Sequence, residues 1–387
     1  METRRQIDRS LLSLILSERL PDSDWDSFSA PDWDSIVRLA QAEGVGPLLY
    51  WRLSRSERIG RLPEPLQAAL RAMYFGTKLN NEQIVRELKT LAGPFEQAGI
   101  PVVVLKGVCF ALTIYPDIDV LVPARRFSEA VRIVKGLGYV EDVPEAVPGL
   151  RALLGDEISL RKTGTPYTVL ELHNSLLVNK SFSYAVPVDW FWEQTDPLSG
   201  PAANMKFETL RMLTPSAQLL YASAHAVLTH GGPNMSLRWL YDLDCLIRSY
   251  AAQIDWDLVL SRASMFHWSS ALDVALSQTC RFFNSPVPDS VLAQLSNTRD
   301  RHRSLIEQKG VGHPSRVMEE YQNLRTRKWY GRLVMLLGLI APAPAYMRWR
   351  YGLKSNWSLP AWYLYRWWGI CKDAVKTLWL VAHRRVS

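Results

Sequence analysis

The sequence contains few cysteines and no pair of them at a metal-binding or redox spacing. Cys109, Cys245, Cys280 and Cys371 stand far apart, each in an apolar segment with helical spacing. The absence of a CxxC motif excludes the common zinc and thiol–disulfide sites. Isolated cysteines of this kind are typical of reduced thiols packed in a core, so they predict a cytoplasmic protein.

The sequence also lacks a hydrophobic run long enough to cross a membrane. The apolar run near the N-terminus is interrupted by Ser13 and Ser17, and no small-residue cleavage site follows it. The longest apolar run near the C-terminus, residues 333–345, is shorter than a membrane-spanning helix and contains two prolines. We therefore expect neither a signal peptide nor a transmembrane helix.

The motifs of several enzyme classes are missing as well. The chain has no GxSxG sequence, no Cys/His pair and no P-loop, so nothing supports a hydrolase or a Walker-type NTPase. It has no internal repeat and no low-complexity segment. With 48% hydrophobic and 21% charged residues over 387 positions, the composition is that of a folded protein of two or three domains.

Hydrophobic periodicity divides the chain into helical ends and a β-rich middle. β-branched or alternating runs predict strands over 101–105, 118–122, 158–161 and 167–173, with an amphipathic helix over 124–137. Helical spacing predicts one long helix over 66–95, interrupted near its end by Gly93-Pro94, and later helices over 215–229, 237–250, 256–283 and 288–308.

This order predicts an α+β fold, in which a small mixed sheet is flanked by helical N-terminal and C-terminal regions. The polar stretch 194–206 is the expected boundary between the sheet and the helices that follow. We expect four parts: an N-terminal helical region (1–98), a core with the sheet (99–195), a C-terminal helical domain (196–324) and a basic, Trp-rich helical tail (325–387).

Two aspartates on the second predicted strand carry the main chemical signal. Asp117 and Asp119 are two residues apart, so both carboxylates project from the same face of the strand. Glu171, on a later strand, can lie beside them. Neighbouring carboxylates repel one another unless a cation lies between them, and Mg²⁺ prefers such oxygen ligands. The sequence therefore predicts all three acids as metal ligands and catalytic residues of a phosphoryl-transfer site, with room for two ions.

The segment before these acids has the features of a phosphate-binding turn. Lys106 supplies positive charge, and Gly107 lets the backbone approach a phosphate at the start of a helix. His173 shares the strand face of Glu171, within reach of substrate or phosphate. The order strand, glycine, helix, strand, Asp-x-Asp predicts a site for a nucleoside triphosphate.

These segments are similar to a known signature. Gly107, followed by Asp117-Ile-Asp-Val120 and later by Glu171-Leu-His173, resembles the DNA polymerase β-like nucleotidyltransferase superfamily. Residues 213–225 (LTPSAQLLYASAH), 237–243 (LRWLYDL) and 254–256 (IDW) resemble recurring elements of a largely uncharacterised bacterial nucleotidyltransferase family within it, often found among exopolysaccharide biosynthesis genes. The resemblance covers roughly residues 30–300.

The resemblance implies a sheet of the nucleotidyltransferase type and a Mg²⁺-dependent enzyme. Such an enzyme moves a nucleoside monophosphate from an NTP to a hydroxyl-bearing acceptor, here with a role in exopolysaccharide biosynthesis. The resemblance also implies that Lys106, Gly107, Val108 and His173 bind the nucleotide.

Two departures from the family pattern favour an alternative function. Val108 stands where the superfamily usually has Ser or Gly, and the loop before Asp117 is shorter and lacks the usual Arg. The alternative is a non-catalytic relative that keeps the fold and serves as a binding or assembly factor at the membrane surface. Retention of the three acids favours the enzyme.

The tail, residues 325–387, combines positive charge with aromatic rings. It has twelve Lys or Arg residues against one acid, Asp373, and seven of the fifteen tryptophans. Interleaved cations and aromatics suit an anionic membrane surface and also single-stranded nucleic acid, and we favour the membrane. The protein would then be cytoplasmic and peripheral at the inner face of the membrane. A helical cap packed on the body is the remaining interpretation.

Two histidines of the helical half are also candidate ligands. His225 and His230 are five residues apart, a spacing that does not put them on the same face of an α-helix. We therefore expect them to have a structural role.

Overall fold

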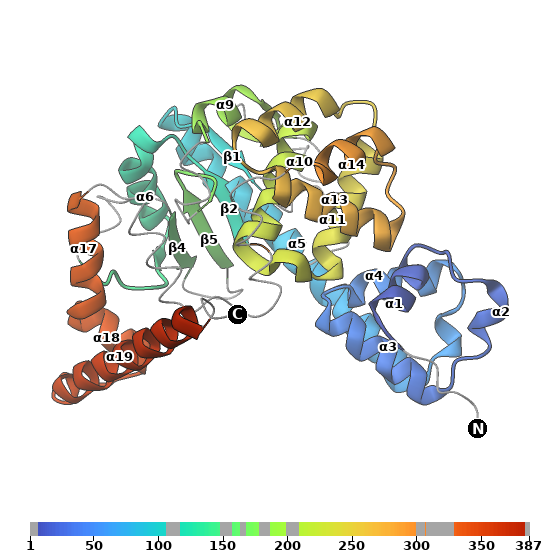
Figure 1. The fold of residues 1–387 in the computed structure, drawn as a ribbon, viewed down its shortest axis with the longest axis horizontal. Helices are drawn as coiled ribbons and strands as arrows, with labels where there is room; N and C mark the ends of the chain where they lie inside the picture. The colour runs from blue at the N-terminus through green and yellow to red at the C-terminus, as the bar shows by residue number, and fades with distance from the viewer. Residues whose placement is uncertain are drawn as a thin grey trace.

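A seven-stranded mixed sheet with helices on both faces forms the centre of the protein (Figure 1). The computed structural model describes residues 7–105, 117–147, 157–162, 168–177, 186–198, 209–298, 306 and 329–383. The expected α+β fold class, with helical regions before and after a mixed sheet, is confirmed.

The strands lie in the order β3-β4-β5-β2-β1-β7-β6. Their bounds are β1 (Val102–Val104), β2 (Asp117–Leu121), β3 (Tyr139–Glu141), β4 (Glu157–Lys162), β5 (Thr168–His173), β6 (Thr195–Pro197) and β7 (Leu210–Leu213). The β2–β5 and β1–β7 pairs are parallel, and the other neighbouring pairs are antiparallel. The sheet thus continues to Leu213, beyond the boundary expected at residue 195, because β7 returns to pair with β1.

The two faces of the sheet contact different helices. Side chains alternate along a strand, so Ile118 and Val120 of β2 point to one side and Leu121 points to the other. Ile118 and Val120 join a buried cluster with α5 (Glu64–Gln97) and α6 (Phe127–Gly136). Leu121 belongs to a second cluster, which contains the helices that follow the sheet.

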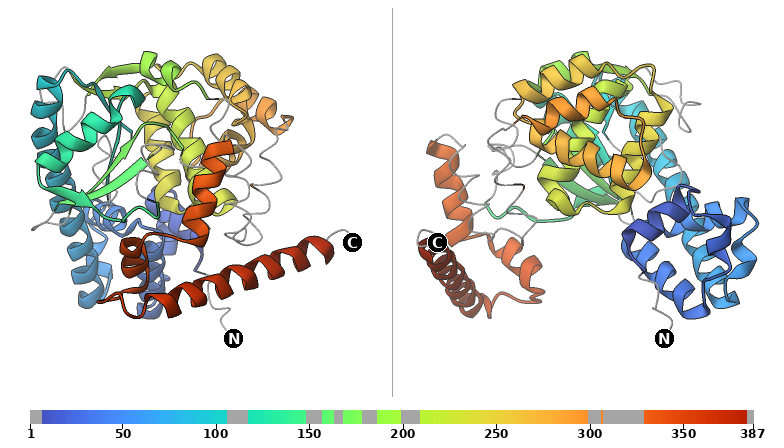
Figure 2. Two further views of the ribbon diagram at one scale, coloured as in Figure 1. Left: turned by 90° about the vertical axis from the view of Figure 1, so that its left-hand side faces the viewer. Right: turned by 45° about the vertical axis from the view of Figure 1, so that its right-hand side comes forward.

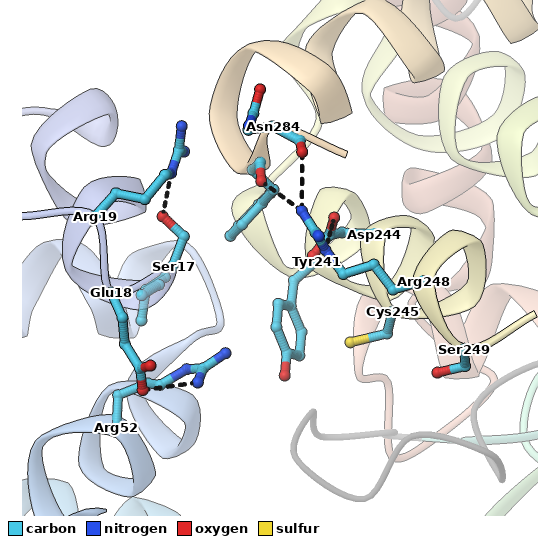
Figure 3. Close-up of a pocket in the computed structure, with 12 residues that line it drawn as sticks. Ser17, Glu18, Arg19, Arg52, Tyr241, Asp244, Cys245, Arg248, Ser249 and Asn284 are labelled. Atoms are coloured by element: carbon cyan, nitrogen blue, oxygen red, sulfur yellow. Dashed lines mark hydrogen bonds and ion pairs between the residues drawn. The ribbon is translucent and has the colours of Figure 1, made fainter. Parts of the chain in front are cut away.

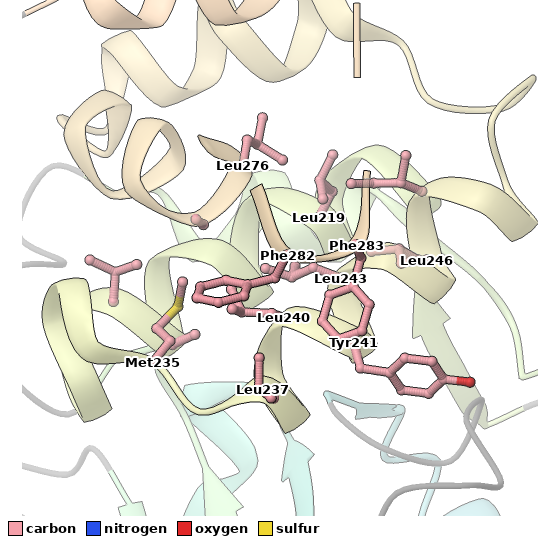
Figure 4. Packing of buried hydrophobic residues seen from close by; sticks show 14 of the residues in the cluster. Leu219, Met235, Leu237, Leu240, Tyr241, Leu243, Leu246, Leu276, Phe282 and Phe283 are labelled. Carbon is pink, nitrogen blue, oxygen red and sulfur yellow. The ribbon is translucent and has the colours of Figure 1, made fainter. Parts of the chain in front are cut away.

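The helices that follow β5 cover the second face of the sheet (Figure 1). They are α9 (Val188–Glu193), α10 (Pro215–Ala224), α11 (Leu237–Ser249), α12 (Trp256–Met265), α13 (Ser269–Phe283) and α14 (Asp289–Ser296). Figure 4 shows the apolar contact between α11 and α13, where Leu240 and Leu243 lie close to Phe282 and Phe283.

The single helix expected over 256–283 is two helices, so that prediction was wrong. The chain breaks at His267, whose φ of +59° lies in the left-handed region. The break allows Trp268 to become fully buried with its ring centroid 5.6 Å from that of Phe266. Burial of a large aromatic side chain offsets the cost of the unusual backbone conformation.

The turn after α10 is a π-helix, η3 (His225–Gly231). Residues five apart face the same way in a π-helix, and the ring centroids of His225 and His230 are 4.6 Å apart. The expectation that they point apart was therefore wrong, because it assumed α-helical geometry. The His230 ring also stacks on Trp239 of α11, with centroids 5.1 Å apart.

The N-terminal region is helical throughout its described part. It consists of α1 (Arg9–Leu16), α2 (Asp22–Trp25), α3 (Ala30–Ala42), α4 (Gly46–Arg55) and the start of α5. Helix α5 has 34 residues, a length of about 50 Å, and carries the chain from this region to the sheet. It is not interrupted at Gly93-Pro94, because Pro94 lies near its end and removes a single backbone hydrogen bond.

The chain ends in an arm set apart from the body (Figure 2). Its helices are α17 (Trp329–Ile340), α18 (Pro344–Tyr351) and α19 (Leu359–His383). The Ala343 N–H donates to the carbonyl of Ala146 at 2.6 Å, which joins the arm to the segment after β3. In the described part of the chain, no helix combines the length and apolar character needed to cross a bilayer.

A carboxylate of the N-terminal region caps a helix of the C-terminal domain. The side chain of Glu43 accepts a hydrogen bond from the Leu237 N–H, the first residue of α11, at 2.7 Å. Its other oxygen lies 3.2 Å from Nε of Arg9. A negative charge at a helix N-terminus satisfies an otherwise unpaired donor and interacts favourably with the helix dipole.

We expect Glu43→Ala to lower the free energy of unfolding by about 1–2 kcal/mol, because it removes this cap and an ion pair. Urea denaturation of the purified protein would measure the change. The control is Glu96→Ala, an exposed acid near the end of α5, which should change stability by less than about 0.5 kcal/mol. Equal effects of the two substitutions would show that the cap does not stabilise the protein.

Candidate active site

A polar patch lies on the sheet face that turns toward the C-terminal helices. It is built by three neighbouring strands, β2, β5 and β4, whose register aligns their side chains in rows across the sheet. The three rows are Asp117, Val169 and Arg161; Asp119, Glu171 and Ser159; and Leu121, His173 and Glu157. Because alternate residues of a strand share a face, all nine side chains start on the same side.

The centre of the patch is a tight group of three side chains. Asp119, Glu171 and His173 each offer a ligand atom, and these atoms lie within 4.8 Å of one another. Nε2 of His173 lies 3.0 Å from Oδ1 of Asp119 and 3.7 Å from Oε2 of Glu171. Asp119 and His173 are almost fully buried, whereas Glu171 keeps a quarter of its side chain exposed. Glu171 is therefore the member of the group that is most accessible to solvent.

Two further acids surround this group. Asp117 lies one row away from Asp119 on the same face, outside the three-residue group. Glu157 of β4 places Oε2 3.5 Å from Nδ1 of His173. Glu157 was not predicted from the sequence. The antiparallel pairing of β4 with β5 makes it the direct neighbour of His173, and this pairing is seen only in the structure. We call Asp117, Asp119, Glu157 and Glu171 the acid patch.

The acid patch changes the titration of its central member. Burial, followed by the negative charges of Asp119, Glu157 and Asp117, raises the pKa of Glu171 to about 9. A carboxyl group in this environment holds a proton at neutral pH unless a cation replaces it. The site is thus arranged to favour a positive charge.

Tyr221 brings a hydroxyl group to the site from the helical side. It is fully buried on α10, and its hydroxyl group has no hydrogen-bond partner among the described residues. Burial, and then the charges of the acid patch, raise its pKa well above the usual value. One turn earlier, Gln218 donates to the carbonyl of Leu105, whose N–H donates to the carbonyl of Asp119. Sequence analysis missed Tyr221, because its segment reads as an apolar core helix.

The structure describes four of the seven residues that the sequence singled out. Asp117, Asp119, Glu171 and His173 lie on one face of two adjacent strands. The remaining three, Lys106, Gly107 and Val108, lie outside the described residues, as does the loop before Asp117.

The donor set of this cluster fits a metal ion. The oxygens of Asp119 and Glu171 are the hard ligands that Mg²⁺ prefers. His173 contacts Asp119 through Nε2, and such a contact fixes the orientation of a carboxylate ligand. The cluster can therefore hold a divalent cation, with the two acids as ligands and His173 as their orienting partner.

A cavity of about 510 Å³ lies elsewhere, between the N-terminal helices and α11 and α13 (Figure 3). Its arginines are engaged in contacts within the protein. Arg19 donates to the carbonyl of Phe282, and Arg248 donates to Asp244 and to two carbonyls at the end of α13. Arg52 pairs with Glu18 at 2.8 Å. The Arg19 contact joins the N-terminal helices to α13, and the cavity contains none of the acid patch.

Comparison with known proteins identifies the family. Residues 29–284 match the family model described as uncharacterised nucleotidyltransferase, which is about two thirds of the chain. The chain therefore belongs to this nucleotidyltransferase family. Neither the search of curated proteins nor the search of solved structures gave a match.

The raised pKa of Glu171 predicts how stability depends on pH. Between the ordinary glutamate pKa of about 4.3 and the folded-state value of about 9, the folded protein binds a proton that the unfolded chain does not bind. Without metal, the free energy of unfolding should therefore fall as pH rises through this window. Urea titrations at pH 5, 7 and 9 in the presence of a chelator would measure the slope.

Substitution of the same carboxyl group tests this assignment. Glu171→Gln cannot lose the proton, so its stability should fall less between pH 5 and pH 9 than that of the unsubstituted protein. Glu96→Gln is the matched control and should keep the original slope, because Glu96 is exposed and belongs to α5, which packs on the opposite face of the sheet. The same slope in Glu171→Gln as in the control would contradict the raised pKa.

Proposed function

We propose that this member of the uncharacterised nucleotidyltransferase family transfers a nucleoside monophosphate from an NTP to a hydroxyl group of an acceptor, in a reaction that requires Mg²⁺. Family membership supports nucleotidyl transfer and an NTP substrate. The observation that carries the Mg²⁺ requirement is the convergence of Asp119, Glu171 and His173 within 4.8 Å. The carboxyl group of Glu171 retains its proton beside Asp119 because a second negative charge there is unfavourable. A bound cation would allow both carboxyl groups to be ionised together.

Each residue of the site has a role in this proposal. Asp119 and Glu171 hold the metal, and Asp117 extends the same face toward a second ion. Bound Mg²⁺ supplies the positive charge that activates an attacking hydroxyl and steadies departing pyrophosphate. His173 keeps Asp119 oriented through its 3.0 Å contact. Lys106, Gly107 and Val108, with His173, are proposed to bind the nucleotide. The acceptor is proposed to belong to exopolysaccharide biosynthesis, as the sequence resemblance implies.

The alternative function is a non-catalytic binding or assembly factor with the same fold at the membrane surface. Val108 and the short loop before Asp117 favour it. The tight grouping of two carboxylates with a histidine favours the enzyme instead. Burying Asp119 beside Glu171 is unfavourable in a protein that binds no metal, so a non-catalytic relative would have no reason to keep this arrangement.

We expect NTP binding to require Mg²⁺ and to be lost in Asp119→Asn, which keeps the shape of the side chain and removes its charge. Calorimetry with and without Mg²⁺, using each of the four NTPs, would measure this. Asp289→Asn is the control, since Asp289 is an exposed acid in the first turn of α14. NTP binding of equal strength without metal, or no binding of any NTP, would favour the non-catalytic alternative.

We also propose that the arm formed by α17, α18 and α19 contacts an anionic membrane surface. Of the sixteen large hydrophobic side chains that are exposed in the described part of the chain, twelve lie in residues 329–383. Trp357 is 87% exposed and Trp368 is 62% exposed. Trp349 and Trp367 are also exposed, which argues against a cap that buries these rings on the body.

Charge on the arm supports the same partner. Arg348, Arg350, Lys354, Arg366 and Lys372 lie among these rings. Tryptophan rings are favourable at the depth of lipid headgroups, and each nearby Lys or Arg adds on the order of 1 kcal/mol of attraction to an anionic surface. This contact would place the protein in the cytoplasm, peripheral at the inner face of the membrane.

We expect the full-length protein to sediment with vesicles that contain phosphatidylserine, and to bind less in high salt because exposed charges are then screened. Trp357→Ser combined with Trp368→Ser should weaken binding at every salt concentration, because apolar burial is not screened. The matched control is Leu79→Ser with Met265→Ser, two exposed apolar residues of the body.

Equal binding by both double variants, or no sedimentation at low salt, would rule out membrane contact through the arm. Stronger binding of a single-stranded oligonucleotide than of vesicles, lost in the tryptophan variant, would instead identify nucleic acid as the partner of the arm.

A further inference from the structure

One cation starts on the same face as the acid patch. Among the nine side chains in the three rows, Arg161 of β4 alone carries a permanent positive charge. It lies in the row of Asp117, with Val169 of β5 between them. Two strand spacings separate the backbones of Arg161 and Asp117, a distance of about 10 Å. A long arginine side chain can cross much of that distance over the smaller Val169.

Arg161 lies in the row of Asp117 and Val169, at one end of the acid patch. β2 and β5 run parallel, so Asp117 and Val169 mark the start of both strands at one edge of the patch. The end of β1 lies near the same edge, where the N–H of Leu105 donates to the carbonyl of Asp119 at 3.0 Å. A ligand that extends from Asp119 and Glu171 toward this edge would pass beside Arg161.

Arg161 forms a weak ion pair with Asp142. Nε of Arg161 lies 3.5 Å from Oδ1 of Asp142, which follows β3 at the edge of the sheet. Nearly half of the Arg161 side chain and a third of the Asp142 side chain are exposed. An exposed ion pair at this separation contributes little to stability, so a stronger anion can replace Asp142 at little cost.

The negative charges of the site favour a positively charged side chain beside the bound triphosphate. A triphosphate is strongly negative, and it must bind beside four carboxyl groups that repel it. Mg²⁺ offsets part of this repulsion, and a guanidinium group offsets more because its planar donors pair with two phosphate oxygens at once.

We propose that Arg161 binds the phosphate chain of the nucleotide whose metal is held by Asp119 and Glu171. The proposal rests on the function proposed above. In this assignment Asp142 competes with the phosphates for Arg161, and Arg161 moves from Asp142 to the phosphates when the nucleotide binds.

The assignment predicts opposite effects for the two members of the ion pair. Arg161→Gln should weaken the binding of magnesium tripolyphosphate and of the magnesium NTPs by about tenfold or more, because charge-assisted hydrogen bonds are lost. Arg161→Lys should restore part of the affinity. Asp142→Asn should bind these ligands more tightly than the unsubstituted protein, because the competing carboxylate is gone.

Calorimetry of the full-length variants would measure these affinities, with thermal denaturation as a check that each variant folds. Arg132→Gln is the matched control, because Arg132 is an exposed arginine of α6 on the other side of the sheet, and it should leave both affinities unchanged. Tripolyphosphate is included because it reports on phosphate contacts without a base or sugar.

Three outcomes would overturn the assignment. Unchanged affinity in Arg161→Gln would exclude contact with the phosphates. An equal loss in Arg161→Gln and Asp142→Asn would show that the ion pair acts by supporting β3 and β4. If the unsubstituted protein bound neither probe in a Mg²⁺-dependent way, the proposed nucleotidyl transfer would itself fail, a result distinct from the first two.

Discussion

The repulsion between buried carboxylates on two adjacent parallel strands is the constraint on which this site depends. The register of β2 and β5 sets Asp119 directly beside Glu171, and the fold then covers this pair with the helices that follow the sheet. Such a placement is costly without a compensating positive charge, because both groups lose water and repel each other. The raised pKa of Glu171 expresses that cost. A divalent cation bound by the two carboxylates would remove this cost, and its binding would then be coupled to proton release and to stability.

The rest of the body can be understood as support for that pair. On one face of the sheet, apolar residues of β2 and β5 pack on α5 and α6, which fixes the strands in register. On the other face, Gln218 of α10 holds the end of β1 beside Asp119, and the buried Tyr221 of the same helix is affected by the charges of the acids. Glu43 and Arg19 attach the N-terminal helices to the domain that carries α10. A change far from the acids can therefore alter the site through these helices.

The arm has a different physical character from the body. The described part of the body buries most of its large apolar side chains, whereas the arm exposes tryptophan and leucine beside arginine and lysine. Among the described residues, the hydrogen bond from the Ala343 N–H to the carbonyl of Ala146 joins the two parts. This separation is consistent with the proposed division of roles, in which the body carries the metal site and the arm contacts the membrane.

The sequence by itself was enough to predict the fold class and to place Asp117 and Asp119 on the same face of one strand, because strand alternation and local spacing are short-range properties. It also indicated Glu171 and His173 through their shared strand face. Only the tertiary structure decided that Glu157 borders His173, that Tyr221 is buried where the charges of the acids act on it, and that Arg161 lies in the row of Asp117. These neighbours come from strand pairing and helix packing between distant segments, which local patterns do not encode. The same reason explains His225 and His230, since a π-helical turn brought together side chains that α-helical spacing separates.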